Sequence, residues 1–226
     1  SIKEFSQLKN EFNCTLILDA ISSYAGSLID LENTPIDYLM STSNKCLQGM
    51  AGIAFSICRK DAIMKIETIQ PRNFYLDLFS QYLSLENNQQ SRFTPPVQTA
   101  YALRIAIDEL INEGFNERIK RYKNNWTKLR SGLEKLGFQL LLDSKYESQI
   151  LLSILEPKNP HYDFNKLHDL LYSEGFTIYP GKVLDGNTFR LSVIGDLNSD
   201  DIENFLECLK KSMLFLGIEL LSKENS

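Results

Sequence analysis

The sequence predicts an α/β protein in which part of a sheet-containing domain is followed by a smaller α+β domain. Three observations support this fold class. Apolar runs at residues 14–18 and 36–40 each lead to one charged side chain, which is how an open parallel sheet builds a site. Two long helical patterns occupy residues 94–136. Beyond them, strand patterns alternate with two helices, as in a layered α+β domain.

The first half of the chain is expected to hold one helix and three strands. Apolar residues at helical spacing indicate a helix over residues 1–13. The continuous apolar run at 14–18 predicts a strand buried on both faces, and runs at 36–40 and 53–58 predict two more strands. Residues 67–93 show no regular pattern, so they form either a loop that caps a substrate or a plain surface connection.

The next segment contains a strong helix start. Thr94 can cap free amide groups, and the prolines that follow it, Pro95 and Pro96, fit the first turn of a helix. We expect this helix to continue to about Ile111 and to stop at Gly114.

A second helix with one apolar stripe follows directly. Its apolar residues alternate in spacing between four and three: Phe115, Ile119, Tyr122, Trp126, Leu129, Leu133 and Leu136. This stripe fits either a coiled coil or a helix lying across a sheet. Because it ends at Gly137 after three heptads, we favour the second interpretation.

The rest of the chain reads as strands and helices in alternation. Strands are predicted over residues 138–142, 149–155, 176–179 and 188–193. Helices are predicted over 163–173 and 199–216, the latter starting at Ser199 with two aspartates behind it. We place the domain boundary within the helices and assign residues 1–100 and 101–226 to the two domains. The chain begins at Ser1 without Met and reaches its first strand early, so we expect the later part of a longer protein.

Composition excludes several classes of protein. The chain has 226 residues, 43% of them hydrophobic, which suffices for one or two domains. The net charge is −5 and the basic residues are scattered, so no nucleic-acid surface is expected. The short basic runs 120–121 and 210–211 indicate solvated helix faces or, alternatively, anion contacts. No apolar run approaches the roughly 20 residues of a membrane span, and we expect a cytoplasmic protein.

The cysteines and histidines do not form a metal-binding pattern. Four cysteines without metal spacing indicate reduced, mostly buried thiols in a cytosolic protein. His161 and His168 have no third ligand nearby, so surface or capping roles are expected for both.

Two strand ends supply the residues that carry chemistry. Asp19 follows the first apolar run, and Lys45 follows the second after a few small polar residues. Alone, each could be an ordinary charge at the end of a strand. Together, an acid and an amine suggest pyridoxal phosphate, a cofactor that needs a lysine to attach it and an acid facing its pyridine nitrogen. Cys46 is not expected to take part, because adjacent side chains on an extended segment point apart.

The segment around Lys45 resembles the attachment signature of class V aminotransferases. The matching pieces are Ile36-Asp37-Tyr38-Leu39, Thr42-Ser43-Asn44-Lys45 and Gly52-Ile53-Ala54-Phe55-Ser56. The position before the lysine is usually Gln, His or Arg in the broad class, and Asn44 departs from that pattern, which indicates a particular subgroup. Residues 19–26, 43–49, 93–99, 179–182 and 189–196 resemble, in order, the 2-aminoethylphosphonate–pyruvate transaminases.

This resemblance implies a fold and an activity. It implies the C-terminal portion of a fold type I PLP-dependent transferase large domain, over 1–100, plus a small C-terminal domain. The implied enzyme is a homodimer with small-molecule amine and keto-acid substrates. It moves the amino group of 2-aminoethylphosphonate to pyruvate, giving phosphonoacetaldehyde and alanine. The alternatives are another class V transaminase (alanine–glyoxylate, serine–pyruvate or phosphoserine type) or an inactive fragment that needs its N-terminal part. A desulfurase is disfavoured, since no cysteine lies on a late Gly/Ser-rich loop.

The resemblance also assigns roles to five residues. Lys45 would attach the cofactor and move a proton at the substrate carbon. Asp19 would keep the pyridine nitrogen protonated. Asn44 would donate to the cofactor phosphate, or else stabilise its own turn. Thr94 would reach the phosphate of the neighbouring subunit's cofactor as well as capping its helix. Arg190 would bind the carboxylate or phosphonate of the substrates, or else form a surface salt bridge.

Overall fold

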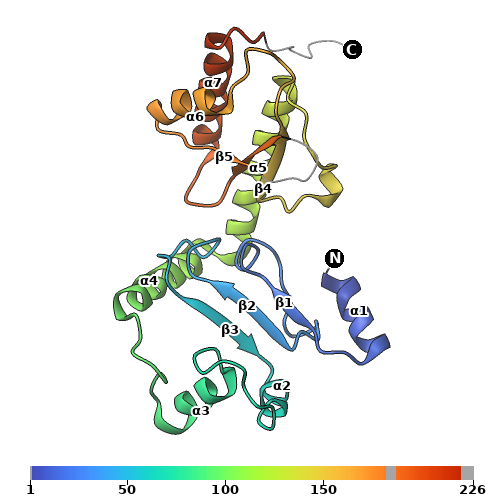
Figure 1. The fold of residues 1–226 in the computed structure, drawn as a ribbon, viewed down its shortest axis with the longest axis vertical. Coiled ribbons are helices and arrows are strands. Elements are labelled where there is room, and N and C mark those ends of the chain that lie inside the picture. Colours follow the sequence, from blue (N-terminus) through green and yellow to red (C-terminus); the bar gives the residue numbers. More distant parts are fainter. Residues whose placement is uncertain (1, 182–186, 220–226) are drawn as a thin grey trace. The chain divides into compact units, whose positions relative to one another are not determined.

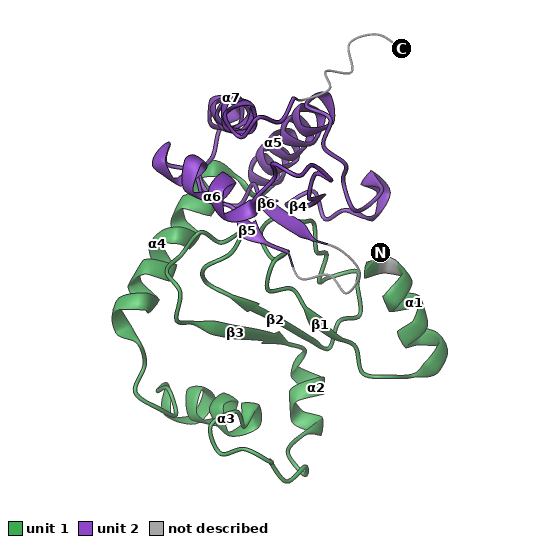
Figure 2. Cartoon of the chain, turned by 45° about the horizontal axis from the view of Figure 1, so that its top comes forward, with its two compact units in different colours: residues 1–115 green, residues 116–226 purple. Residues whose placement is uncertain are grey.

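The computed structural model describes residues 2–181 and 187–219, and the chain separates into two compact units, residues 1–115 and 116–226 (Figure 2). The first unit contains α1 (Ile2–Phe12), β1 (Ile17–Asp19), β2 (Tyr38–Thr42), β3 (Ala54–Cys58), α2 (Lys60–Lys65), α3 (Leu78–Asn88) and α4 (Val97–Glu113) (Figure 1). The second contains α5 (Phe115–Lys135), a 3-10 turn (Ser144–Tyr146), β4 (Leu151–Leu155), α6 (Phe164–Ser173), β5 (Tyr179–Pro180), β6 (Thr188–Ser192) and α7 (Ser199–Phe215). The domain assignment 1–100 and 101–226 stays a prediction.

The first unit is built on a three-stranded sheet in the order β1-β2-β3. β1 and β2 run parallel, and β3 pairs antiparallel with β2. One face of the sheet is covered: Ala20, Ile36 and Leu39 form a buried cluster. Apolar side chains pack around this cluster from α1, from β1 and from the loop that follows β1: Ile2, Leu16, Leu18, Tyr24 and Ile29.

Two expectations for the first strand were wrong. The strand is Ile17–Asp19, not 14–18, and it is not buried on both faces, because the Ile17 side chain is 57% exposed. The physical reason is that the buried cluster packs against Leu18 on one face of β1, while Ile17 points to the other face and is not among the side chains that pack on the cluster. The second strand extends to Thr42 because β3 pairs with it as far as the Thr42–Ala54 position.

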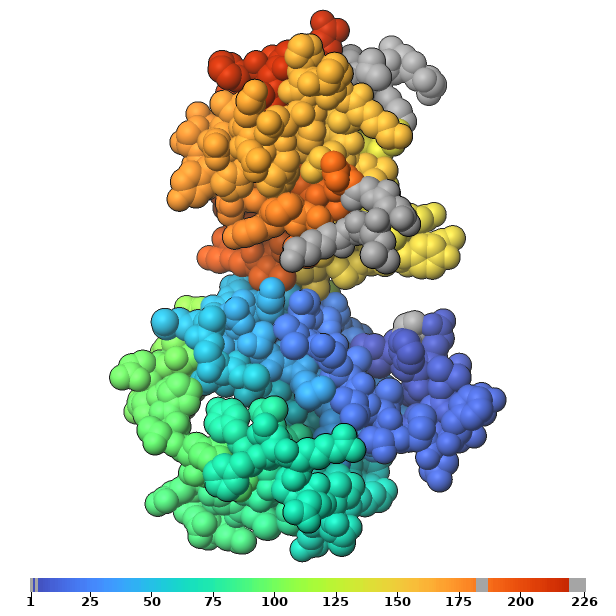
Figure 3. All heavy atoms as spheres, in the orientation of Figure 1, coloured from blue at the N-terminus to red at the C-terminus, as the bar shows by residue number. Residues whose placement is uncertain are grey.

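The segment 67–93 is more ordered than its sequence pattern indicated. It contains α3, whose start is capped by the Asp77 carboxylate accepting from the Ser80 N–H. Phe79 and Tyr82 lie one turn apart on this helix, a spacing that could have revealed it. Figure 3 shows the segment in teal-green as a bulky part of the surface of the first unit, in keeping with the 74% exposure of Phe74. The short helix α2 was also missed.

The second unit pairs an antiparallel sheet, in the order β4-β6-β5, with three helices. The predicted apolar stripe is buried within this unit at Tyr122, Trp126, Leu129 and Leu133, so α5 needs no coiled-coil partner. A tight contact near its C-terminal end places Gly132 against Leu206 of α7, where an added Cβ would lie 2.2 Å from a Leu206 methyl carbon. The predicted helix is therefore confirmed, whereas its placement across a sheet stays a prediction.

Several details of the second unit differ from the sequence-based expectation. Residues 138–142 form no strand and share only an isolated bridge, Leu140 with Ile154, before Asp143 caps the 3-10 turn. The cap of α7 is Asn198 rather than Ser199, and with Asp201 it forms a capping box. Arg121 is not a solvated charge, because it donates to the Gly195 carbonyl oxygen at 2.8 Å.

The structure shows how far each cysteine is buried and whether any described helix resembles a membrane span. All four cysteines are free thiols, but only Cys46 is buried, whereas Cys14 is exposed and Cys58 and Cys208 are intermediate. The expectation of mostly buried thiols was therefore wrong, because the runs that hold Cys14 and Cys58 are only partly covered. Within 2–181 and 187–219, no helix is long and apolar enough to cross a membrane.

Candidate active site

Two strand ends meet at one edge of the first sheet. Because β1 and β2 are parallel and Asp19 lies opposite Met40, both strands point their carboxyl ends toward the same edge. The two segments stay hydrogen-bonded to each other beyond that point. Ala20 N–H donates to the Met40 carbonyl oxygen at 2.8 Å, and the Ser41 hydroxyl donates to the Ala20 carbonyl oxygen at 3.2 Å. The sheet therefore brings the segments of Asp19 and Lys45 together, at the edge where open α/β sheets bind ligands.

Lys45 lies in a tight turn that its own backbone closes. Gln48 N–H donates to the Lys45 carbonyl oxygen at 2.8 Å, and Gly49 N–H donates to the Ser43 carbonyl oxygen at 2.8 Å. A Cβ at Gly49 would lie only 3.0 Å from that Ser43 oxygen, which explains the glycine. The Lys45 side chain is half-buried, and among the described residues its amine has no ion-pair partner. The turn thus presents an amine that no carboxylate of the described residues neutralises.

Cys46 points into the protein rather than toward a substrate. Its side chain is 0% exposed, and the thiol donates to the Ser22 carbonyl oxygen at 3.2 Å. Ser22 belongs to the loop that follows Asp19, so this contact ties the two loops of the site to each other.

Asp19 and Asn44 each make a short-range contact. The Asp19 carboxylate accepts from the Ile21 N–H at 3.0 Å and is otherwise exposed. The Asn44 side-chain oxygen accepts from the Thr42 hydroxyl at 2.9 Å, which is the turn-stabilising contact expected as its alternative role. That contact uses only the oxygen, so the side-chain NH₂ group keeps its two donors.

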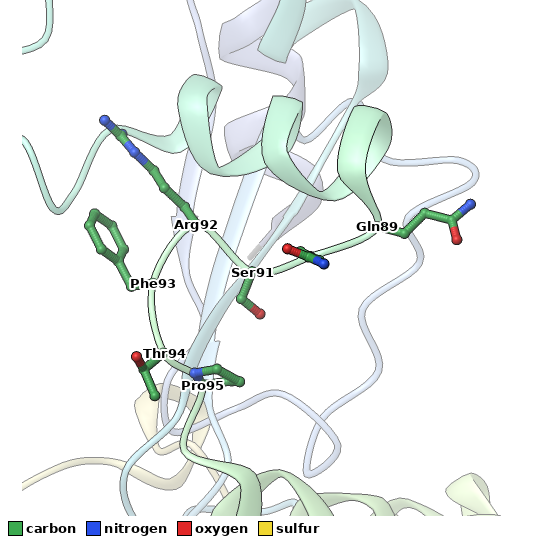
Figure 4. Close-up of a pocket in the computed structure, with 7 residues that line it drawn as sticks. Gln89, Ser91, Arg92, Phe93, Thr94 and Pro95 are labelled. Carbon is green, nitrogen blue, oxygen red and sulfur yellow. The ribbon is translucent and has the colours of Figure 1, made fainter.

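Thr94 does not cap a helix, contrary to the expectation. The helix begins at Val97 with Pro96 as its N-cap, and no side chain caps it. The reason is that Pro95 and Pro96 have no N–H for the threonine to satisfy. Thr94 is exposed instead and lines a shallow hollow of about 770 Å³ with neighbours that include Arg92 (Figure 4).

Arg92 stands beside Thr94 but is already engaged. It pairs with Asp77 at 3.2 Å and lies over the Phe74 ring at 4.5 Å from the centroid. In Figure 4 its side chain points away from Thr94. The pKa of Asp77 lies below its usual value. Hydrogen bonds from Ser80 to the carboxylate are the main cause, and Arg92 adds to them. Arg92 therefore orders the loop rather than supplying a free positive charge.

Asp37, a residue of the signature, has a structural role that the sequence did not indicate. Its carboxylate accepts from Lys9 Nζ at 2.6 Å and from the Leu16 N–H at 2.8 Å. Burial alone would raise its pKa, but these hydrogen bonds and the Lys9 charge outweigh burial, so the pKa lies below the usual value. Asp37 thus fixes α1 and the start of β1 to β2, and so supports the strand that ends in Asp19.

Arg190 lies on β6 in the second unit, with an exposed side chain. Its guanidinium donates to the Pro180 carbonyl oxygen at 3.3 Å. No salt bridge to a carboxylate is found for it in the part of the chain that the structure describes, so the surface-pair alternative has no support there. Lys182, part of the same resembling segment, lies outside the described residues.

Within the described ranges, no cluster of three His, Cys, Asp or Glu side chains could hold a metal ion.

Comparison with known proteins decides the family. A family model described as aminotransferase class V matches residues 1–182. This chain belongs to the class V aminotransferases. It is 38% identical over 212 residues to the bifunctional phosphonoacetaldehyde hydrolase/aminoethylphosphonate transaminase of Clostridioides difficile, covering 93% of this chain and 33% of that protein. It is 37% identical over 212 residues to the 2-aminoethylphosphonate–pyruvate transaminase of Bacillus cereus, covering 93% of this chain and 58% of that protein.

The solved structures agree on the fold of this class V aminotransferase chain. The pyridoxamine-pyruvate aminotransferase of Mesorhizobium loti superposes with a TM-score of 0.86 at 22% identity, covering 97% of this chain and 57% of that one. The predicted fold class, part of a fold type I PLP-dependent transferase, is thereby confirmed. The chain spans less than two thirds of the length of these relatives.

The family implies pyridoxal phosphate, and the residues present fit it. The strand ends offer an amine at Lys45, with no ion-pair partner in the part of the chain that the structure describes, and an exposed carboxylate at Asp19, the two groups that this cofactor requires. Asn44 adds free amide donors, and Thr94 adds an exposed hydroxyl.

Proposed function

We propose that this chain is the main part of a transaminase that moves the amino group of 2-aminoethylphosphonate to pyruvate. The observation that carries the proposal is the parallel pairing of β1 with β2, which places Asp19 and the Lys45 turn at one edge of a sheet. The names of the relatives at 37–38% identity favour this amine donor over other class V donors.

Each site residue then has a chemical task. Bound pyridoxal phosphate would withdraw electrons from the substrate carbon that bears the amine. Lys45 Nζ holds the cofactor and carries a proton to or from that carbon. The Asp19 carboxylate keeps a positive charge on the pyridine nitrogen. The amide of Asn44 and the hydroxyl of Thr94 donate to the phosphate, and the Arg190 guanidinium binds the anionic end of the substrate.

A homodimer belongs to the same proposal. Thr94 is exposed and does not cap its own helix, so its hydroxyl is free to serve the cofactor of a second subunit. Sedimentation of the assembled protein should give twice the monomer mass, and a monomer that is fully active would contradict this assignment.

The experiment joins this chain to the part of the Bacillus cereus relative that it does not cover. Purified fusion protein with pyridoxal phosphate, 2-aminoethylphosphonate and pyruvate should release phosphonoacetaldehyde and alanine, whereas the Lys45→Ala fusion should not. Activity only with glyoxylate, serine or phosphoserine would instead support another class V transaminase. No conversion of 2-aminoethylphosphonate, with a cofactor absorbance band present, would overturn the proposed substrate.

The chain alone is the necessary comparison. We expect it to bind the cofactor weakly or not at all, because its described loops contain no Gly-rich phosphate cradle. A strong, Lys45-dependent absorbance band without the added part would contradict that expectation.

A further inference from the structure

The second sheet has one side that is buried within its unit and another on which Tyr179, Arg190 and Ser192 are exposed while Thr188 is buried. Leu152, Ile154, Phe189 and Leu191 are buried on one side. Because strand side chains alternate, the other side carries the odd-numbered residues of β4 and β5 and the even-numbered residues of β6. Arg190 is the only charged residue among those of the three described strands on that side.

Tyr179 lies directly opposite Arg190 in the antiparallel pairing of β5 with β6. Side chains at opposite positions share a face, with Cβ atoms about 4.5–5.5 Å apart. The Tyr179 side chain is 60% exposed, and its hydroxyl has no hydrogen-bond partner among the described residues. Tyr179 and Arg190 therefore share one side of the sheet, and no described residue pairs with the phenol hydroxyl.

The backbone holds these two side chains in place. The Arg190 guanidinium donates to the Pro180 carbonyl oxygen at 3.3 Å, so it leans toward β5. Gly181 N–H donates to the Thr188 carbonyl oxygen at 2.6 Å, and a Cβ at Gly181 would lie 1.9 Å from the Thr188 hydroxyl oxygen. The two strands approach too closely at Gly181 for any side chain, which fixes β5 beside Arg190.

Arg190 has two cross-strand neighbours, Tyr179 on β5 and Ser153 on β4, and its guanidinium leans toward only one of them. Ser153 of β4 lies opposite Arg190 on the other side. Because the guanidinium leans toward β5, its charged end lies on the Tyr179 side and away from Ser153. Ser153 is thus a matched hydroxyl in the same row that should not reach the same ligand.

We propose that Tyr179 determines specificity for a phosphonate over a carboxylate by donating a hydrogen bond to the anion held by Arg190. A guanidinium fork binds two oxygens of either anion. A phosphonate, like a phosphate, presents a third acceptor oxygen that a carboxylate lacks. The Tyr179 hydroxyl would bind that third oxygen. The identity of the anion as the end of the substrate rests on the proposed function.

The test measures anion binding by NMR on the full chain, with methylphosphonate and acetate as separate probes. In the parent chain, methylphosphonate should shift the Arg190 side-chain resonance and bind more tightly than acetate. Tyr179→Phe should weaken methylphosphonate binding about tenfold, the effect of losing one hydrogen bond to a charged group. Acetate binding should change less than about twofold in the same variant, and Ser153→Ala should change neither.

Three results would overturn the proposal: no methylphosphonate shift at Arg190 in the parent, equal affinities in Tyr179→Phe and the parent, or equal weakening of both probes. The spectrum of each variant, unchanged outside this face, verifies folding. Attachment of pyridoxal phosphate to Lys45 is measured separately, on the fusion protein. Its absence with the anion preference intact would reject the proposed function and leave the Tyr179 assignment standing.

Discussion

Asp19 lies directly opposite Met40 across the parallel strands β1 and β2, and the next amide, Ala20 N–H, donates to the Met40 carbonyl oxygen at 2.8 Å. This register decides where the carboxylate goes. A shift of one residue would turn Asp19 to the other face of the sheet, since side chains alternate along a strand. The chemistry proposed for the site therefore depends on a backbone pairing as much as on the acid itself.

Lys45 is expected to be the lysine that pyridoxal phosphate modifies. Reduction of the cofactor-loaded fusion with borohydride should leave the label on the peptide that contains Lys45, because this amine has no described ion-pair partner to keep it occupied. Mass spectrometry of the digested protein locates the label. Lys45→Arg should abolish it and the exposed control Lys60→Arg should keep it. A label found mainly elsewhere would refute the assignment.

Asp19→Asn should lower transamination without preventing attachment of the cofactor. The amide cannot stabilise a positive pyridine nitrogen, and loss of one such electrostatic group costs about 10²-fold in rate. Steady-state kinetics of the fusion protein measure the effect, with borohydride labelling as the binding control. Asp61→Asn, which removes an exposed carboxylate paired with Arg59 at 2.9 Å, should leave the rate unchanged. A rate equal to the parent's in Asp19→Asn would rule out this role.

Asp37→Asn should destabilise the first unit by about 3 kcal/mol, because it leaves Lys9 without its largely buried partner. The folded pKa of Asp37 is below its ordinary value of 3.8, so the folded state binds fewer protons than the unfolded one in that range. Its stabilising contribution is therefore present above pH 3.8 and is lost as the pH falls through the folded pKa. Hydrogen exchange of the Leu16 amide, measured across a pH series, reports this stabilising contribution of Asp37. The variant should show a smaller acid dependence than the parent.

Glu147→Gln should change how the stability of the second unit depends on pH, in the direction opposite to that expected for Asp37 in the first unit. Burial of Glu147, whose side chain is 2% exposed, raises its pKa above 4.5 despite Arg130 at 2.6 Å. The folded state then binds more protons than the unfolded one between 4.5 and the raised pKa, so this contribution weakens as the pH rises through that window. The glutamine variant has no such loss.

Fluorescence of Trp126 during denaturation monitors the second unit, since it is the only tryptophan and is buried there. Parent and Glu147→Gln should therefore differ in stability by an amount that changes with pH above 4.5, as the pH rises through the raised pKa of Glu147. A difference that is constant over this range would show that Glu147 does not titrate as described.

Local sequence patterns predicted elements whose signals are strong and short in range. The α5 stripe was visible because buried apolar residues one turn apart repeat from Tyr122 to Leu133. By contrast, α3 was missed, since its cap Asp77 and its half-buried apolar residues lie among many exposed ones. Residues 138–142 look like a strand by composition but pair with β4 only through the bridge of Leu140 with Ile154 and the two backbone hydrogen bonds that flank it, which no local pattern could show.

The sequence by itself determined the family and the two strand-end charges at Asp19 and Lys45, because each depends on residue type and spacing along the chain. The tertiary structure alone decided that Asp37 binds Lys9 and Leu16, that Thr94 caps no helix, and that Tyr179 stands beside Arg190. These are relationships between residues distant in sequence or set by where a helix begins. They follow from strand register and hydrogen-bond competition, which are fixed only when the chain is folded.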